Sequence, residues 1–332
     1  MTKKFLIAQY EVVIEAGDQG LSLPAYKGST LRGGFGAAFR RIACSRREVR
    51  CRDCLLGTGC PYAYIFETAP PPGSEALRNY ESVPRPFVLE PPLDTRIEYR
   101  PGERISFYLI LIGRAAGYLP YFIVAFKELG EMGIGRGRKK YRLAEIRAVN
   151  PVNGEKRVIY RNEDQVVRNV NLAVETDIEK ELKFSGKPLP GGSVSLELLT
   201  MTRIKYEDNF VHRLEFHMLV RSLLRRISSL ACFHHGWELD LDFSGLIERA
   251  AEVRVVGDET RWVDWERYSS RQDGKMNLGG LVGRVTYQGQ VSAFKPLLKL
   301  GELVHVGKGA VFGMGKYTIL KGAEGIGKRS ET

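Results

Sequence analysis

The sequence Leu300-Gly-Glu-Leu-Val-His-Val-Gly-Lys-Gly-Ala-Val-Phe-Gly-Met-Gly-Lys-Tyr-Thr-Ile-Leu320 combines a glycine-rich loop with a strand-like run. Glycine lets a backbone approach a ligand closely and adopt positive φ. Backbone N–H groups in such a loop can hold a phosphate, and lysines add positive charge. We therefore predict that the loop binds phosphate through Gly307, Lys308, Gly309, Gly313, Gly315 and Lys316. A mobile hairpin is the alternative interpretation.

A second stretch resembles the first: Leu129-Gly-Glu-Met-Gly-Ile-Gly-Arg-Gly-Arg-Lys-Lys-Tyr-Arg-Leu143. Both begin Leu-Gly-Glu, pass through alternating glycines with basic residues, and continue into Tyr and a strand-like run. Such self-similarity indicates a structural repeat. We predict that Arg136, Arg138 and Lys139 in the earlier loop also bind an anionic ligand.

The elements around the two loops are predicted to follow one order. In the first half, strands at Phe5–Ile14, 104–113 and 142–149 surround two helices, the second at 118–129. In the second half, a strand at 194–204 precedes a long helix at 208–233. Later strands, a short helix and the opening loop complete the set. This order predicts an α+β protein with two tandem ferredoxin-like (βαββαβ) domains, each ending in a glycine-rich loop.

The domain boundaries follow from these elements. Residues 1–150 are predicted to form the N-terminal domain, with a cysteine-containing insertion at 44–60. Residues 151–192 are predicted to be a connector with room for a hairpin, and residues 193–321 to form the C-terminal domain. The Gly- and Lys-rich residues 322–332 are predicted to be a disordered tail.

The charge balance favours an anionic partner. The 332 residues include 50 Lys and Arg against 39 Asp and Glu, for a net charge of +11. Such an excess is typical of nucleic-acid binding, and Arg32 and Arg40 are candidate phosphate contacts in the first predicted helix. No apolar run approaches the ~20 residues of a membrane span, and the first residues resemble no signal peptide. These observations predict a cytoplasmic protein with no membrane partner.

Four of the five cysteines lie close together in the sequence, at Cys44, Cys51, Cys54 and Cys60. Four thiolates suit tetrahedral Zn²⁺ in a structural site. We predict a structural zinc site with no catalytic role, because four protein ligands leave no open position. An iron–sulfur cluster or reduced thiols are the alternatives.

The glycine-rich stretches and the basic character of the chain resemble the RAMP superfamily of CRISPR-associated, RRM-like RNA-binding proteins. Within it, the chain is similar to the precursor-CRISPR-RNA processing endoribonucleases, in the branch with a cysteine cluster. The motifs that carry this resemblance are Gly301–Lys316, Met276–Gly283 and Lys27–Gly33. The resemblance implies CRISPR repeat RNA or guide RNA as partner, together with other CRISPR effector subunits.

The resemblance also implies a reaction without a catalytic metal. In such enzymes the 2′-hydroxyl attacks the neighbouring phosphate, which leaves a 2′,3′-cyclic phosphate and a free 5′-hydroxyl. The reaction needs a base, an acid and a cation that stabilises the phosphorane charge. Histidine suits proton transfer because its unperturbed pKa is about 6.5.

The chain departs from the common family pattern because it has no histidine before His212. Tyr26 and Lys27 occupy the matching neighbourhood and are candidates for a hydroxyl and a cation. His305, beside the opening loop, and His235, at a predicted helix end, are the candidate imidazoles. His305 has an alternative role, in which it orders the loop by hydrogen bonding. We interpret His212, His217 and His234 as surface or core residues.

Two other functions remain open. The missing N-terminal histidine favours a non-catalytic RAMP subunit that binds guide RNA within a CRISPR effector complex. A metalloprotein that holds its metal through the four clustered cysteines and binds DNA is the third possibility.

Overall fold

The computed structural model describes residues 3–68, 83–182, 191–269 and 274–320. The chain divides into two compact units. Unit 1 comprises Met1–Asp177, Ile227–Leu239 and Ala310–Gly313. Unit 2 comprises Ile178–Arg226, Asp240–Gly309 and Met314–Thr332. Both units draw on more than one segment of the chain, because the chain returns to unit 1 twice after residue 177.

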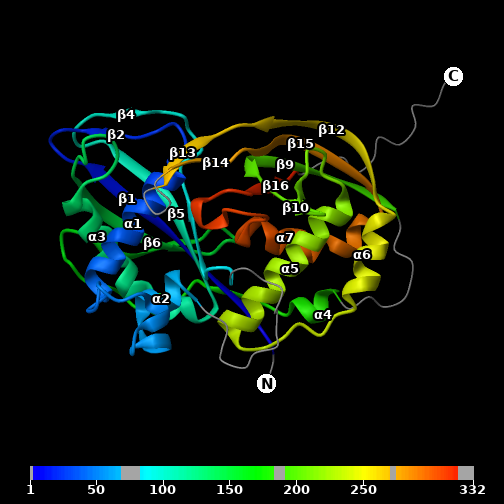
Figure 1. Ribbon diagram of the computed structural model, residues 1–332, viewed down its shortest axis with the longest axis horizontal. Helices are drawn as coiled ribbons and strands as arrows, with labels where there is room; N and C mark the ends of the chain where they lie inside the picture. Colours follow the sequence, from blue (N-terminus) through cyan, green and yellow to red (C-terminus); the bar gives the residue numbers. More distant parts are fainter. Residues whose placement is uncertain (1–2, 69–82, 183–190, 270–273, 321–332) are drawn as a thin grey trace. The chain divides into compact units, whose positions relative to one another are not determined.

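Unit 1 is built on an antiparallel sheet with the order β3-β5-β1-β6-β7 (Figure 1). Its strands are β1 (Phe5–Ala16), β3 (Phe87–Glu90), β5 (Arg104–Ile112), β6 (Tyr141–Val149) and β7 (Lys156–Arg161). The short β8 (Val174–Thr176) pairs with the start of β1. A separate small sheet joins β2 (Leu21–Ser22) to β4 (Glu98–Tyr99).

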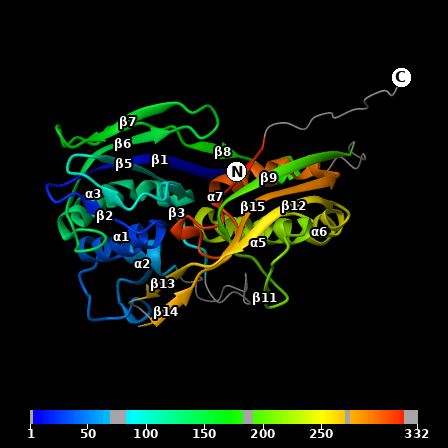
Figure 2. The same ribbon diagram turned by 90° about the horizontal axis from the view of Figure 1, so that it is seen from above.

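The helices of unit 1 lie on one face of this sheet (Figure 2). They are α1 (Gly28–Ala43), α2 (Pro61–Phe66) and α3 (Leu119–Met132). Alternate residues of β1 supply the apolar face, and the core beneath the helices combines aliphatic side chains with a group of phenylalanine rings. Its members include Val12, Ile14, Phe35, Phe39, Phe87, Phe122 and Phe126.

The glycines of α1 allow it to pack closely on its neighbours. A Cβ atom at Gly34 would lie 2.7 Å from Cδ1 of Leu129 on α3. A Cβ atom at Gly36 would lie 3.4 Å from the ring of Phe66 on α2. The helix therefore accepts the lower intrinsic propensity of glycine, about 1 kcal/mol relative to Ala, at positions where neighbouring side chains lie against its backbone.

Unit 2 repeats this arrangement with the sheet order β12-β15-β9-β16. Its strands are β9 (Gly192–Thr202), β12 (Arg254–Val263), β15 (Gly280–Gly289) and β16 (Tyr317–Ile319). Its helices are α4 (Ile178–Leu182), α6 (Phe243–Ala251), α7 (Lys295–Val304) and the first part of α5 (Phe216–His235), whose residues from Ile227 onward belong to unit 1. Two small hairpins pair β10 (Lys205–Tyr206) with β11 (Asn209–Phe210), and β13 (Glu266–Ser269) with β14 (Gly274–Asn277).

Both sheets have the same topology. In unit 1 the chain order β1-α1-β3-β5-α3-β6 gives the spatial order β6-β1-β5-β3. In unit 2 the chain order β9-α5-β12-β15-α7-β16 gives β16-β9-β15-β12. Each is therefore a βαββαβ module with the fourth strand beside the first, and the prediction of two tandem ferredoxin-like folds is confirmed.

Two of the differences between the structure and the predicted elements concern the connector and the long helix. The predicted connector, residues 151–192, contains β7 and β8, which pair with β6 and β1 of unit 1. The long helix begins at Phe216 rather than at Asp208, because residues 205–210 form the β10–β11 hairpin instead. The predicted tail, 322–332, lies outside the described residues.

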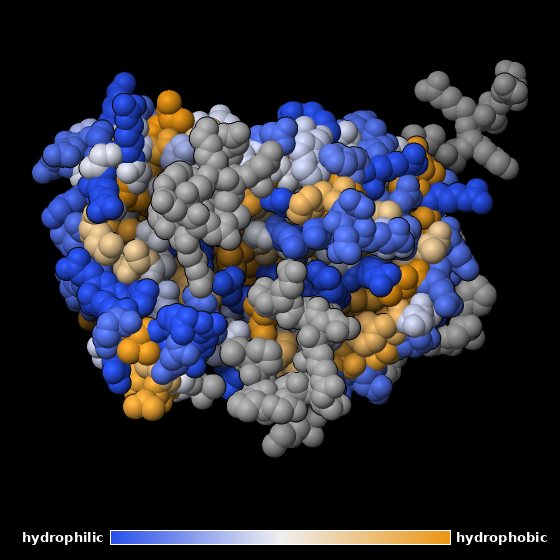
Figure 3. Space-filling view, in the orientation of Figure 1, coloured by the Kyte–Doolittle hydropathy of each residue, from blue (hydrophilic) through white to orange (hydrophobic). Residues whose placement is uncertain are grey.

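Hydrophilic residues make up most of the described surface in the view of Figure 3, with smaller hydrophobic areas between them. A few large apolar side chains are exposed, including Leu55 at 92% and Val152 at 80%. None of the described helices has the length and apolar character needed to cross a membrane.

Candidate functional site

The glycine-rich loop of unit 2 joins α7 to β16, and its glycines are required by backbone geometry. Gly307, with φ of 79°, would place a Cβ atom 2.4 Å from the carbonyl oxygen of Arg203. Gly315, with φ of 70°, would place one 1.8 Å from the carbonyl oxygen of Val306. Larger residues would clash with main chain at both positions, so these glycines define the loop conformation.

Several backbone amides of this loop are used by the fold. The N–H of Lys308 donates to the carbonyl of Arg203 at 2.8 Å, and the N–H of Gly315 donates to that of Met201 at 3.0 Å. The N–H of Lys316 donates to Oγ1 of Thr200 at 2.9 Å. These three amides bind the end of β9, which argues against the predicted phosphate cradle at these positions. The side chain of Lys308 is exposed, so its charge remains available for an anion, and that of Lys316 is half-buried.

Residues Ala310–Gly313 of the same loop belong to unit 1 and pack on the start of α1. A Cβ atom at Gly28 would lie 1.9 Å from the carbonyl oxygen of Phe312, so only glycine fits there. Gly313, with φ of 78°, would place a Cβ atom 2.3 Å from Cδ of Pro91. Gly309 also has positive φ, at 86°.

The matching loop of unit 1 follows α3 and carries an exposed basic group. Gly133 and Gly135 have φ of 77° and 71°. The N–H of Arg136 donates to the carbonyl of Ser22 at 2.9 Å, which fixes the loop against β2. The side chains of Arg136 and Arg138 are exposed and that of Lys139 is half-buried. The structure thus leaves the predicted cations of this loop accessible.

His305 lies in the core of unit 2 and is 0% exposed. Its Nδ1 atom lies 3.0 Å from the carbonyl oxygen of Met314, so the ring connects the two ends of the loop. A carbonyl oxygen only accepts, so Nδ1 carries the proton. His305 also ends α7 with φ of 62°. This geometry favours the loop-ordering role over proton transfer to a bound ligand.

His235, at the end of α5, has both ring nitrogens engaged by backbone of unit 1. Nε2 accepts from the N–H of Leu6 at 2.9 Å, and Nδ1 lies 3.1 Å from the carbonyl oxygen of Leu230. The ring also packs on Phe5, with centroids 4.4 Å apart. Burial lowers the pKa of His235 below its ordinary value. A neutral ring with both nitrogens occupied is a structural histidine in this conformation.

Tyr26 and Lys27 are also held by internal contacts. The Tyr26 hydroxyl donates to the carbonyl of Phe312 at 2.7 Å, and burial, reinforced by the charge of Glu90, raises its pKa. Lys27 is 0% exposed. Its Nζ donates to the backbone oxygen of Asp94 at 2.8 Å and pairs with Oδ1 of the same residue at 3.2 Å. Neither side chain presents its polar group to solvent.

Arg32 and Arg40 pack along aromatic rings on the surface of α1. The guanidinium of Arg32 lies 5.2 Å from the ring centroid of Phe66 and 5.4 Å from that of Phe312. The guanidinium of Arg40 lies 5.7 Å from the Tyr62 ring, and its Nη2 donates to the Arg47 carbonyl at 2.7 Å. These contacts hold both guanidinium groups in place, while each residue keeps partial exposure.

The four clustered cysteines are free thiols. Among the residues that the structure describes, no group of three or more His, Cys, Asp or Glu side chains is arranged to hold a metal ion. Cys44 follows the end of α1, Cys51 and Cys54 flank a short turn, and Cys60 precedes α2 and is 8% exposed. The geometry therefore does not support the predicted zinc site with four cysteine ligands.

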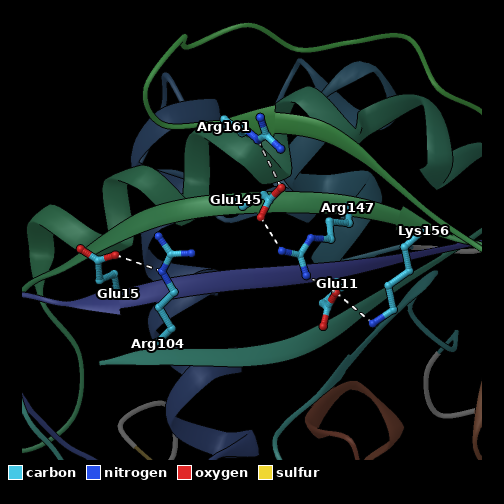
Figure 4. A network of polar contacts seen from close by, with 7 residues as sticks. All are labelled: Glu11, Glu15, Arg104, Glu145, Arg147, Lys156 and Arg161. Carbon is cyan, nitrogen blue, oxygen red and sulfur yellow. Dashed lines mark hydrogen bonds and ion pairs between the residues drawn. The ribbon is translucent and has the colours of Figure 1, made fainter. Parts of the chain in front are cut away.

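The face of the unit 1 sheet opposite its helices carries a network of ion pairs (Figure 4). Arg147 pairs with Glu11 at 3.2 Å and with Glu145 at 2.6 Å. Lys156 pairs with Glu11 at 3.1 Å, and Arg161 with Glu145 at 3.4 Å. RRM domains stack bases on aromatic residues of this face. Here opposite charges neutralise each other on β1, β6 and β7, which favours a structural role for the face.

The three remaining histidines differ in burial and in the contacts of their rings. His234 is 0% exposed, with Nε2 2.7 Å from the carbonyl oxygen of Pro84, as expected for a core residue. His212 is exposed beside Trp262, and His217 is half-buried beside Tyr206. In the described part of the chain, neither of these two rings has a hydrogen-bonded nitrogen, so they are the accessible imidazoles.

Comparison with known proteins connects these features to a family. Residues 196–317 match the family model of the CRISPR-associated endoribonuclease Cas6, and residues 5–172 match the AF_1859_N model, described as an N-terminal domain. An uncharacterized protein of Archaeoglobus fulgidus is 25% identical over 308 residues, covering 90% of this chain and 92% of the relative.

Solved structures share the fold at low sequence identity. A Cas6 product complex matches with a TM-score of 0.55 and 17% identity, over 95% of this chain and 99% of that chain. A Thermus thermophilus Cas6 matches with a TM-score of 0.52 and 16% identity, over 95% of this chain and 99% of that chain. A partial Cas6-RT-Cas1–Cas2 complex matches with a TM-score of 0.53 and 15% identity, over 97% of this chain and 48% of that chain. Residues 5–172 place the chain in the family of the AF_1859_N model, and the match of residues 196–317 to the CRISPR-associated endoribonuclease Cas6, over the module that contains the glycine-rich loop, confirms the predicted resemblance to CRISPR-associated RNA-processing endoribonucleases.

Proposed function

We propose that this protein cuts CRISPR repeat RNA into guide RNAs by attack of a 2′-hydroxyl, without a catalytic metal. The observation that carries the proposal is the match of residues 196–317 to the Cas6 family model, a segment that includes the glycine-rich loop. The exposed cations of both loops support an RNA partner, since Lys and Arg contacts to phosphate supply most of the affinity for nucleic acids.

The reaction is balanced by two proton transfers. A base takes the proton of the 2′-hydroxyl, the oxygen attacks phosphorus, and the bond to the 5′-oxygen breaks as that oxygen receives a proton. The product ends are a 2′,3′-cyclic phosphate and a 5′-hydroxyl. Lys308 is the proposed cation for the negative charge that develops on the phosphate oxygens.

Proton transfer is assigned to an accessible imidazole in place of His305 or His235. His217 is the first residue to test, because its ring is half-buried and has no hydrogen-bonded nitrogen among the described residues. It lies 5.5 Å from the ring of Tyr206, and the guanidinium of Arg221 lies 5.8 Å from the same ring. His217 therefore has a phenol and, in Arg221, a cation additional to Lys308 in its surroundings.

A second function is favoured by a different observation. Internal hydrogen bonds engage the four catalytic candidates from the sequence, which are His305, His235, Tyr26 and Lys27. A subunit that binds guide RNA without cutting it, alongside other CRISPR proteins, would also have this arrangement.

One experiment separates the two functions. Purified protein is incubated with cognate repeat RNA and with a scrambled RNA of the same length, both in EDTA, and binding and cleavage are measured together. Specific cutting of the repeat, reduced by about 10²–10⁴ in His217→Ala, supports the nuclease. Tight binding of an intact repeat rejects it in favour of the binding subunit.

A further inference from the structure

The segment between β9 and α5 forms a small hairpin with no counterpart in the predicted elements. β10 and β11 pair through Lys205 with Phe210 and through Tyr206 with Asn209. Glu207 and Asp208 make the turn with φ of 47° and 62°. A two-stranded hairpin of this size is marginally stable by itself, so its side chains must find contacts elsewhere in unit 2.

The hairpin and the residues after it contact Trp262 on β12, and together they form a row of aromatic rings. The ring of Phe210 lies 6.5 Å from that of Trp262 on β12, and the ring of His212 lies 4.4 Å from Trp262. The indole N–H of Trp262 donates to Oδ1 of Asp264 at 2.9 Å, which fixes the orientation of the ring. Phe210 and Trp262 are each half-buried and His212 is exposed, so the row is accessible. We call these three residues the hairpin platform.

Cations surround the platform. The guanidinium of Arg203 lies 4.0 Å from the Phe210 ring centroid, and Nζ of Lys205 lies 5.9 Å from it. Acidic residues are present too, at the hairpin turn and at Asp264, but the latter is held by the indole N–H. Aromatic rings with adjacent cations are the usual composition of a site for single-stranded nucleic acid, because every base has a face that can stack.

The platform is continuous with the glycine-rich loop. The carbonyl of Arg203 accepts the N–H of Lys308 at 2.8 Å, and Gly307 lies against the same carbonyl. Arg203 therefore belongs to both features, because its backbone holds the loop and its guanidinium lies beside the Phe210 ring. An RNA strand whose phosphate contacts Lys308 can extend directly onto the platform.

We propose that the hairpin platform binds unpaired bases of the RNA strand held at the glycine-rich loop, with Trp262 and Phe210 stacking on the bases. This proposal rests on the proposed function and adds a specificity: the enzyme recognises a single-stranded segment that adjoins the cut region. Arg203 and Lys205 supply the phosphate contacts between stacked bases.

The test compares two RNAs: a cognate stem-loop with a single-stranded tail, and the same stem-loop trimmed to a blunt end. Binding is measured for wild type and for Trp262→Ala, Phe210→Ala and Trp262→Phe. Loss of one stacked base weakens binding by about 5- to 150-fold. We expect that loss for the two Ala variants on the tailed RNA only, and recovery in Trp262→Phe, whose ring still stacks. Tyr121→Ala is the matched control, since Tyr121 is an exposed aromatic residue of unit 1 at 42%.

The outcomes distinguish this inference from the proposed function. If both Ala variants bind the tailed RNA as tightly as wild type, the platform is not a base-binding site, whether or not the RNA is cut. If wild type cuts the blunt stem-loop but gains no affinity from a tail, the inference fails and the nuclease stands. Quenching of tryptophan fluorescence by the tailed RNA, absent with the blunt RNA and absent in Trp262→Phe, supports the assignment in the same samples.

Discussion

The Nδ1 atom of His305 lies 3.0 Å from the carbonyl oxygen of Met314 and connects the two ends of the glycine-rich loop. The residue is buried, and its backbone N–H donates to the carbonyl of Gly301 in the last turn of α7 at 2.9 Å. The backbone of His305 is therefore bonded to α7, and its side chain is bonded to the end of the loop that precedes β16. The histidine nearest to the predicted phosphate site is a structural part of that site.

Replacing His305 by Ala is expected to lower the free energy of unfolding by about 1–3 kcal/mol, because the buried carbonyl of Met314 loses its donor. His305→Asn is the matched control, since its amide can donate to the same carbonyl and Asn tolerates positive φ better than most residues. Urea denaturation measures both. If His305→Ala keeps the wild-type stability but no longer cuts RNA, the structural role is wrong and His305 acts as the base.

Tyr26→Phe removes the hydroxyl that donates to Phe312 and is expected to cost about 0.5–1.5 kcal/mol of stability. The rate of RNA cleavage should stay unchanged, because a buried phenol with a raised pKa is poorly suited to proton transfer. Single-turnover cleavage and thermal unfolding of the same preparation check the two expectations. A loss of rate by about 10² or more without a loss of stability would identify Tyr26 as a proton-transfer group.

His235 makes stability depend on pH in a defined direction. Burial holds its folded-state pKa below the unfolded value of about 6.5. The unfolded chain therefore binds the proton more tightly, so the stabilisation is complete above about pH 6.5 and is lost as pH falls through the folded pKa. Urea midpoints between about pH 5 and 8 measure this, with His235→Gln as the control that lacks the titrating ring. Equal pH dependence in the two proteins would refute the assignment.

Lys308→Gln removes an exposed cation from the glycine-rich loop and leaves the backbone hydrogen bond to Arg203 in place. We expect weaker RNA binding and a salt dependence whose log–log slope is smaller by about 0.7–0.9, the value for one phosphate contact. Lys299→Gln, at an exposed position on α7, is the control. An identical slope for Lys308→Gln and wild type would remove this lysine from the RNA interface.

Much of the fold was predictable because local signals agreed with the topology. The apolar alternation of β1, and Pro120 in the first turn of α3, both indicate their elements. The paired Leu-Gly-Glu segments mark the end of α3 and the end of α7, so the repeat could be read directly. The β10–β11 hairpin was not predicted, because the polar residues from Asp208 onward fit the start of a helix equally well.

The roles of the site residues were less predictable, because they depend on contacts between distant segments. Nothing local to His235 indicates that Leu6, 229 residues away in the chain, donates to its ring. The amide of Lys316 is satisfied by Thr200, 116 residues away. Glycine spacing therefore predicted a loop correctly but could not show that several of its amides are already used.

The central claim is that the chain cuts RNA through the RNA's own 2′-hydroxyl. Mass spectrometry of the fragments from repeat RNA cut in EDTA tests it most directly. We predict a 2′,3′-cyclic phosphate on one fragment and a 5′-hydroxyl on the other, and no cutting when the nucleotide before the cleaved bond is 2′-deoxy. Fragments with a 3′-hydroxyl and a 5′-phosphate, or repeat RNA that is bound but left intact, would contradict the account.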